Sequence, residues 1–231
     1  MKTGIALSHY NLGFTAVIAG DNASARSYFE QALAGYDDLA DQLGRGNALG
    51  GLALVDRATG DYERGRQRAA DGLSLQRLSG DDFGATNSLS LLGSITSQMG
   101  RVREAEAMFR EALISHERVG NMSGIGWMLL ELAATAVTRG QPARAILLSG
   151  AARSLEGKQG GGIAVHVLLH LADRINTAWD QLEPAQAERA WDNGRLMNQQ
   201  QAVAAALTDP QVACLPQEGG RSARYGRDED N

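Results

Sequence analysis

The sequence has one cysteine, four prolines and few aromatic residues, and these scarcities exclude whole classes of protein. Cys214 has no second cysteine with which to form an intrachain disulfide, and no Cys/His cluster has the spacing of a zinc site. No apolar run reaches the roughly 18 residues of a membrane span, and Ser8–Asn11 interrupt any signal-peptide core near the N-terminus. We therefore expect a cytoplasmic protein that neither crosses nor binds a membrane.

Other absences bear on partners. The formal net charge is -5, from 22 basic and 27 acidic residues, without a dense Lys/Arg block. Direct binding of nucleic acid is therefore not expected, and nothing resembles a helix-turn-helix. No GxxxxGK[ST] phosphate-binding loop occurs, so an ATPase centre is not expected either.

Glycine, by contrast, is abundant and regularly spaced. The chain has 28 glycines, and those at 20, 60, 100 and 140 are separated by equal intervals. Three further columns keep the same period: a second glycine column, a leucine followed by Gly or Ala, and a small residue after each hinge glycine. These columns are Gly4, Gly44, Gly84 and Gly124; Leu12-Gly13, Leu52-Ala53, Leu92-Gly93 and Leu132-Ala133; and Ala25, Gly65, Ala105 and Ala145. Four columns in register indicate four structural repeats.

Each repeat has helical periodicity on both sides of its hinge glycine. Ala25, Phe29, Ala32, Leu33 and Tyr36 fall at i, i+4, i+7, i+8 and i+11, which is one face of a helix. No alternating strand-like run competes with this pattern. Each repeat is therefore predicted to be a helical hairpin.

The hinge glycines suit the turn between the two helices, because glycine adopts the left-handed conformation without strain. Asp21 and Asp61 then stand where they can cap the second helix. The leucine column is expected to fill the seam of each hairpin, and the small residues after it are expected to let the two helices approach closely. Because one hairpin cannot bury its apolar face alone, the hairpins should stack into an α-solenoid.

These columns resemble tetratricopeptide repeats, whose pattern reads here as Leu12-Gly13, Ala25, Phe29 and Ala32 in the first unit and Leu92-Gly93, Ala105, Phe109 and Ala112 in the third. The family's early tryptophan is replaced by His9, Leu49, Leu89 and Leu129, and its terminal proline by Asp37, Arg77 and Glu117. The period of 40 exceeds the usual 34 or so. The resemblance implies an all-α, tetratricopeptide-like solenoid.

The longer period is similar to the repeats at the C-terminal end of bacterial signalling ATPases, including LuxR-type transcriptional regulators. Segments 143–157 and 187–207 resemble the way those chains end, with a Gly-Ala-Ala helix, an Ala-Trp-x-x-Gly-Arg segment and a final Ala/Val-rich helix. This resemblance implies a regulatory or sensing arm. Because Met1 lies just ahead of Gly4, where the first repeat begins, we expect a truncated or separately encoded arm.

The chain divides into three regions by composition. Residues 1–156 form the four hairpins, and residues 157–207 form a glycine-rich linker followed by C-terminal capping helices. Residues 208–231 carry proline, glycine and mixed charge without helical periodicity, which predicts a disordered tail.

Evidence for catalysis is weak. His166, His170 and Asp173 fall on one helix face, but Val167 stands where a zinc peptidase has glutamate, so no metal or cofactor is expected. The serines at 88, 90, 94 and 97 are expected to mark a polar, exposed side of a helix. No serine occupies a G-x-S-x-G elbow. We expect a protein that is not an enzyme.

The functional prediction rests on the groove that the family lines with the first helix of each hairpin. The matching positions include a pair of asparagines in successive repeats, and the predicted groove residues are Tyr10, Phe14, Asn47, Arg57, Asn87, Ser94 and Trp127, with Leu7, Leu54 and Leu130 beside them. Asparagine amides suit a peptide backbone, and aromatic and arginine side chains anchor partners. The aromatic residues would equally suit packing between repeats.

Three functions follow from this sequence. The first is a non-enzymatic scaffold that binds a protein or peptide partner in the groove, as the regulatory arm of an ATPase-type transcriptional regulator. The second is a sensor that binds a small-molecule inducer between the last repeat and the terminal helices, and a stand-alone tetratricopeptide adaptor is a variant of the first. The third, a metal-dependent enzyme, requires metal at His166 and His170.

Overall fold

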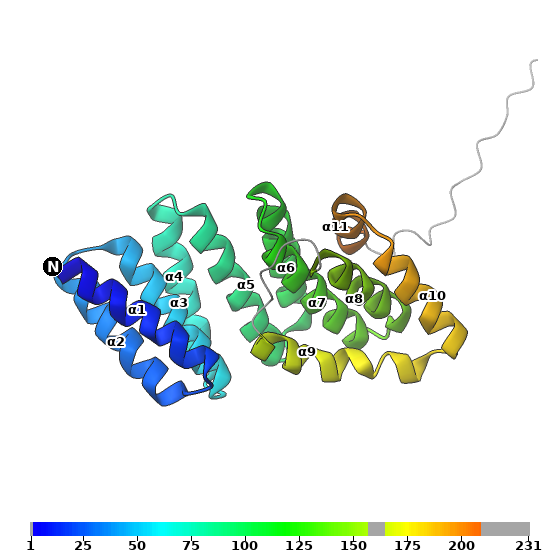
Figure 1. The fold of residues 1–231 in the computed structure, drawn as a ribbon, viewed down its shortest axis with the longest axis horizontal. Coiled ribbons are helices and arrows are strands. Elements are labelled where there is room, and N and C mark those ends of the chain that lie inside the picture. The colour runs from blue at the N-terminus through cyan, green and yellow to red at the C-terminus, as the bar shows by residue number, and fades with distance from the viewer. Residues whose placement is uncertain (1, 157–164, 209–231) are drawn as a thin grey trace, which may run out of the picture.

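The chain forms a stack of helical hairpins. The computed structural model describes residues 2–156 and 165–208, with side chains for 2–155 and 171–208, and every regular element in those ranges is helical. The four hairpins are α1 (Lys2–Ile18) with α2 (Asn22–Asp38), α3 (Gln42–Ala58) with α4 (Tyr62–Leu78), α5 (Asp82–Gln98) with α6 (Val102–Arg118), and α7 (Met122–Thr138) with α8 (Pro142–Glu156). Each helix packs on the next, and the predicted all-α solenoid is confirmed (Figure 1).

The repeat arises from equal helices joined by short turns. Each of the first seven helices has 17 residues, or about 25 Å at 1.5 Å per residue. The predicted hinge glycines are left-handed, with φ between 68° at Gly140 and 80° at Gly60. Gly80 and Gly120 do the same after α4 and α6, so the turn recurs twice in each sequence repeat. Ala40 occupies the one such turn without glycine, at φ 52°.

Polar caps begin most of these helices. The side chains of Asp21, Asp41, Asp81 and Asn121 each accept a hydrogen bond from the amide three residues later, at 2.9–3.0 Å. The predicted cap at Asp61 is wrong: its side chain makes no cap hydrogen bond and pairs instead with Arg64 at 2.8 Å. The arginine competes for the carboxylate that would have reached the backbone.

One contact recurs between successive repeats. The side chain in the last turn of each second helix lies against the glycine that opens the next hairpin: Tyr36 on Gly44, Gln76 beside Gly84 and His116 on Gly124. A Cβ on Gly44 or Gly124 would overlap the facing ring, so these positions need glycine for space and not for a turn. This contact explains three members of the second glycine column, whereas a Cβ on Gly4, which no described helix precedes, would meet nothing within 4 Å.

His116 is the most constrained of the three, because it is fully buried. Its Nε2 lies 3.0 Å from the Oγ of Ser90, whose single hydroxyl proton goes to the carbonyl of Thr86. Nε2 must therefore carry the ring proton and donate it to Ser90. Its Nδ1 has no hydrogen-bond partner among the described residues, and burial lowers the pKa of His116 to about 4.

The predicted close approach of helix backbones at small residues occurs in the second hairpin, where a Cβ on Gly65 would lie 3.3 Å from the carbonyl oxygen of Ala53. Glycines of α1 and α3 instead make room for an aromatic ring. A Cβ on Gly13 would lie 2.6 Å from the ring of Phe29, and one on Gly51 would lie 2.5 Å from it. The leucine seam also differs from the prediction at its first position. Leu12 is 43% exposed, whereas Leu52, at the same place one repeat later, is buried, because no described helix precedes α1.

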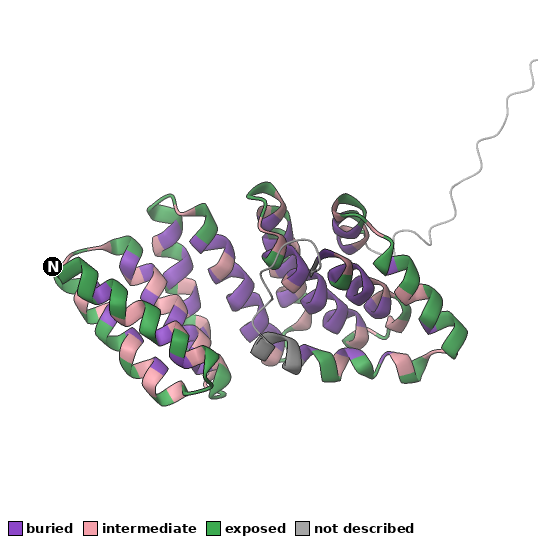
Figure 2. Cartoon of the chain, viewed as in Figure 1, coloured by how far each residue is buried: buried purple, intermediate pink, exposed green. Residues whose placement is uncertain are grey.

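The predicted exposed serine face is also wrong. Ser88, Ser90, Ser94 and Ser97 are all buried within α5, which neighbouring helices cover on most sides. Figure 2 shows buried residues concentrated in the middle of the stack, around α5 and α7. Three serines and threonines of α5, Thr86, Ser90 and Thr96, return their hydroxyl protons to carbonyls four residues earlier, which satisfies them without an external partner.

A buried carboxylate joins three helices of the first two hairpins. The Asp56 side chain on α3 is fully buried and contacts Arg26 of α2 at 2.7 Å and Arg64 and Arg68 of α4 at 2.9 and 2.7 Å. Burial acts to raise the pKa of Asp56, but hydrogen bonds from Arg64 and Arg26 and the charge of Arg68 outweigh it, and the pKa is lowered. The clamp holds the first two hairpins together.

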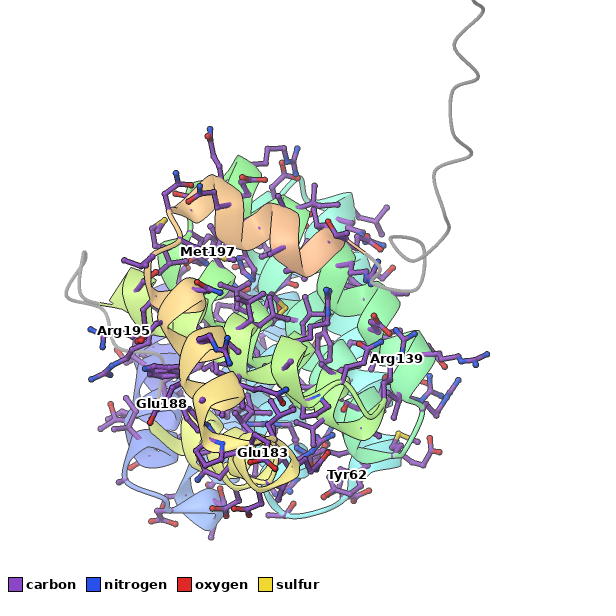
Figure 3. The ribbon with its side chains drawn as sticks, turned by 90° about the vertical axis from the view of Figure 1, so that its right-hand side faces the viewer. Tyr62, Arg139, Glu183, Glu188, Arg195 and Met197 are labelled. Carbon is purple, nitrogen blue, oxygen red and sulfur yellow. The ribbon has the colours of Figure 1, made fainter. Side chains whose placement is uncertain are left out.

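Shorter helices cover the C-terminal end of the stack, which faces the reader in Figure 3. They are α9 (Val165–Asn176), a 3₁₀ turn (Trp179–Gln181), α10 (Pro184–Arg195) and α11 (Gln199–Leu207). Helix α10 packs along α8 so closely that a Cβ on Gly150 would lie 2.5 Å from the carbonyl oxygen of Trp191, and Gly194 is equally tight. No helix in the described parts of the chain is long and apolar enough to cross a membrane.

Changing Ala40 to glycine should stabilise the fold. A left-handed conformation costs a non-glycine residue about 1–2 kcal/mol, and glycine's larger unfolded-state entropy returns part of this, so we expect a gain of about 0.5–1 kcal/mol. Gly60→Ala is the matched reverse change, because a Cβ added there would meet nothing within 4 Å and only the backbone conformation is affected. Chemical denaturation measures both. Equal stability of all three proteins would contradict the turn assignment.

His116 should make the fold sensitive to mild acid. Its pKa is about 4 when folded and 6.5 ordinarily, so its contribution to the free energy of unfolding is complete above pH 6.5 and declines as the pH falls toward 4. The expected loss is about 2–3 kcal/mol. His116→Gln introduces the residue found at the same repeat position, Gln76, and should remove this part of the pH dependence. Parallel stability curves for both proteins between pH 7 and 4 would contradict it.

Candidate functional site

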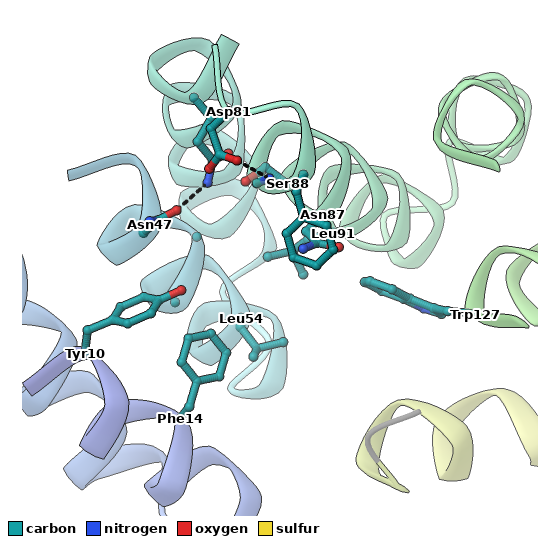
Figure 4. A pocket seen from close by; sticks show the side chains of 14 residues that line it. Tyr10, Phe14, Asn47, Leu54, Asp81, Asn87, Ser88, Leu91 and Trp127 are labelled. Atoms are coloured by element: carbon teal, nitrogen blue, oxygen red, sulfur yellow. Dashed lines mark hydrogen bonds between the residues drawn. The ribbon is translucent and has the colours of Figure 1, made fainter. Parts of the chain in front are cut away.

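A cavity of about 370 Å³ lies on the face formed by the first helix of each hairpin. All four of these helices contribute to it, together with the end of α4 and the turn before α5. Its lining residues are Tyr10, Phe14, Asn47, Gly50, Gly51, Leu54, Gln76, Asp81, Phe83, Gly84, Asn87, Ser88, Leu91 and Trp127. Figure 4 shows Tyr10 and Phe14 on one side of this groove pocket and Trp127 on the other.

Two adjacent glycines hollow out the pocket. At the repeat position of Gly50, the other hairpins carry Tyr10, Ser90 and Leu130. A Cβ on Gly50 would meet only the Oγ of Ser88, at 3.6 Å, so the space above it is open. Gly51 is required for a different reason, since its missing side chain accommodates Phe29.

The predicted asparagine column faces this hollow. Asn47, Asn87 and Trp127 occupy one repeat position on α3, α5 and α7, and all three line the pocket. The side-chain amides of Asn47 and Gln76 are hydrogen-bonded at 2.9 Å, which orients Asn47. Asn87 makes no side-chain hydrogen bond with any described residue, so its amide can serve a ligand.

Aromatic rings form the N-terminal wall of the pocket. Tyr10 and Phe14 pack edge to face with centroids 5.0 Å apart, and Phe14 packs in the same way on Phe29 at 5.2 Å. Burial, and then the proximity of Tyr36 and Asp81, raise the pKa of Tyr10 to about 12. The hydroxyl of Tyr10 therefore stays protonated and available as a hydrogen-bond donor.

Two predicted groove residues, Arg57 and Ser94, are not among the lining residues. Arg57 donates a hydrogen bond to the Oγ of Ser94 at 3.3 Å, next to the buried Glu131. Burial raises the pKa of Glu131 and lowers that of Arg57. The indole N–H of Trp127 donates to Glu131 at 3.2 Å, so the hydrogen bond to this buried carboxyl orients the Trp127 ring that lines the pocket.

The sequence analysis missed several lining residues, chiefly Gly50, Gln76, Asp81 and Phe83. Gly50 could have been identified from the sequence, because the other hairpins have larger residues at its repeat position. Asp81 could have been identified as well, because it stands three residues before a periodic glycine, as Asp41 does. Gln76 belongs to the second helix of its hairpin, and only the stacking of hairpins brings it to the groove.

A second cavity, of about 470 Å³, lies between the last hairpin and the terminal helices. Leu130, Leu171, Ile175 and two tryptophans line it, with Trp179 and Trp191 at 5.9 Å between ring centroids. The sequence predicts an inducer site between the last repeat and the terminal helices; this cavity lies there, and inducer binding stays a prediction.

Other predicted features lie outside the described residues. The side chains of His166 and His170, the linker at 157–164 and the tail at 209–231 are among them. Within the part of the chain that the structure describes, no three His, Cys, Asp or Glu side chains are grouped so as to hold a metal ion. The metal hypothesis at His166 and His170 therefore stays untested.

Comparison with known proteins agrees with the repeat pattern. One tetratricopeptide-repeat family profile matches residues 4–77 and a second matches residues 86–119. The chain therefore contains tetratricopeptide repeats in these two segments. Repeats of this family form scaffolds for protein–protein interaction, and the groove pocket lies on the helices that line the family's binding face.

The tetratricopeptide fold is also found in a solved structure that is similar to this chain, the crystal structure of aspartyl phosphate phosphatase F from Bacillus subtilis. The TM-score is 0.63 at 15% sequence identity, and the match covers 98% of this chain. This chain spans 64% of the length of that protein. At this identity the likeness concerns the fold alone. No curated protein matches the sequence.

Proposed function

We propose that this tetratricopeptide-repeat protein is not an enzyme and holds an extended segment of a protein partner in the groove pocket. The observation that carries the proposal is that two asparagine amides one repeat apart, those of Asn47 and Asn87, line the same pocket as the open space over Gly50. An extended peptide offers alternating backbone amides and side chains, so it needs this combination of polar and apolar contacts.

The size of the pocket supports one buried side chain as the anchor. A volume of about 370 Å³ is near the lower end of the roughly 300–1,000 Å³ of small-ligand sites. Tyr10, Phe14 and Trp127 would surround the anchor, and aromatic side chains dominate the energetics of such contacts. Flanking residues of the segment would then lie over Asn47 and Asn87.

The composition of the pocket supports binding over catalysis. The lining residues include Ser88 but no histidine, lysine or cysteine that would activate or replace it as a nucleophile. Its titratable groups are Asp81 and the Tyr10 phenol, whose pKa is raised to about 12. Neither forms the nucleophile–base pair of a hydrolase.

We extend the proposal to a cellular role as the regulatory arm of a bacterial ATPase-type transcriptional regulator. Segments 143–157 and 187–207 supply the support, because the features that resemble the end of such chains meet in space. Gly150 of the first segment packs against Gly194 of the second, where α8 and α10 cross. A stand-alone adaptor would use the same groove.

The second cavity favours one alternative, a small-molecule sensor. Its lining of Trp179, Trp191 and aliphatic side chains suits the apolar part of an inducer, and the polar groups of Ser149, Arg153 and Asn176 would orient its polar part. Binding there would raise the melting temperature in the absence of any protein partner.

Filling the hollow should abolish partner binding. Random peptides displayed on phage would be selected on the purified chain, and the selected peptide would be synthesised. We expect Gly50→Leu to weaken its affinity at least tenfold, because the added side chain occupies the anchor's space. Gly50→Ala is the control: it fills little volume, stabilises the helix by about 1 kcal/mol and should bind normally.

The polar and aromatic walls provide a second test with the same peptide. Asn87→Ala should weaken binding about two- to tenfold, as expected for one hydrogen bond, and Trp127→Ala should weaken it tenfold or more. Circular dichroism and melting curves confirm folding of each variant. Failure to select any peptide, or full affinity of Gly50→Leu, would refute the groove assignment.

A further inference from the structure

The groove pocket contains one formal charge, and it is negative. Of the residues that line it, Asp81 is acidic and none is Lys, Arg or His. Its neighbour Asp82 points elsewhere and pairs with Arg118 at 3.2 Å. Asp81 forms no ion pair with any described residue, and its one side-chain hydrogen bond there is the cap to the amide of Gly84, at 3.0 Å.

Two nearby positive sources do not cancel this charge. The N-terminus of α5 carries the equivalent of about half a positive charge, which offsets only part of a full carboxylate. Arg57 lies outside the pocket lining, hydrogen-bonded to Ser94 beside the buried Glu131. After burial and the proximity of Tyr36, the charge of Asp81 also contributes to the raised pKa of Tyr10.

The walls around this carboxylate are aromatic. Tyr10, Phe14, Phe83 and Trp127 come from three different hairpins, and all four line the same pocket as Gly50 and Asp81. The negative faces of aromatic rings attract a cation, most strongly when it is partly removed from water. The same rings pack well on an alkyl chain.

We propose that the pocket takes a lysine or arginine side chain of the partner segment, with its alkyl stem between the aromatic rings and its cationic head beside Asp81. This inference rests on the proposed function. A long basic side chain meets both chemistries of the pocket, whereas a glutamate or a terminal carboxylate would face Asp81 with the same charge. The partner segment is thus basic, and its C-terminal carboxylate does not lie in this pocket.

The variant Asp81→Asn removes the charge at position 81 and keeps a side chain that can cap α5. Asn121 caps α7 at the same repeat position, with its Oδ1 accepting from the amide of Gly124 at 3.0 Å, so an amide can serve as this cap. Asp41→Asn is the matched control, because Asp41 caps α3 in the same way and does not line the pocket. Both variants lose one negative charge from the whole chain.

The test uses the peptide selected on the wild-type chain and its neutral analogue, in which citrulline replaces arginine or norleucine replaces lysine. We expect the wild-type chain and Asp41→Asn to prefer the cationic peptide at least fivefold. In Asp81→Asn this preference should fall below twofold. Affinities are measured by calorimetry at about 0.15 M salt, where long-range attraction to the acidic chain is largely screened.

The possible failures are distinct. If no peptide is selected, the proposed function and this inference both fail. If the selected peptides carry no basic residue, the groove remains a peptide site and the inference alone is overturned. An unchanged preference in Asp81→Asn would likewise overturn it, since the cation would then lie elsewhere on the surface.

Discussion

Each hairpin after the first is positioned by a ring or amide that lies on its opening glycine. Tyr36, Gln76 and His116 end the second helix of one hairpin and lie against the glycine that opens the next, and a methyl group at Gly44 or Gly124 would force the two apart. Packed interiors do not deform continuously, so this contact sets the spacing of the stack. The groove depends on that spacing, because its walls come from all four hairpins.

The pocket arises where a residue of one hairpin differs from those at the same position in the other hairpins. The backbone repeats from one hairpin to the next, yet the position occupied by Tyr10, Ser90 and Leu130 in other hairpins is glycine at 50. The missing side chain leaves space that the adjacent ring of Tyr10 borders and does not fill. The pocket of this repeat protein thus lies where one unit differs from its neighbours at an aligned position.

The repeated helices and turns could be predicted from the sequence, whereas the burial of each helix face could not. Periodic glycines identified the turns, and the aligned Asn47, Asn87 and Trp127 line one pocket, since residues one period apart occupy the same face of successive hairpins; their role in binding stays a prediction. Burial depends on neighbours that periodicity does not reveal. Ser90 is buried although serine is usually exposed, and Leu12 is half exposed although Leu52 is buried. Gln76 reaches the pocket only through the stacking of hairpins.

At position 81, the hydrogen bond of a helix cap can be distinguished from the charge of the side chain that makes it. A helix cap requires an oxygen that accepts a hydrogen bond, and Asn121 supplies one to α7 without any charge. Aspartate at 81 therefore adds a full negative charge beyond the cap's hydrogen bond, inside a pocket walled by aromatic rings and lacking a basic residue. No basic side chain lines the pocket to meet this charge. The cap geometry belongs to the fold, and under our proposal the charge meets a basic side chain of the partner.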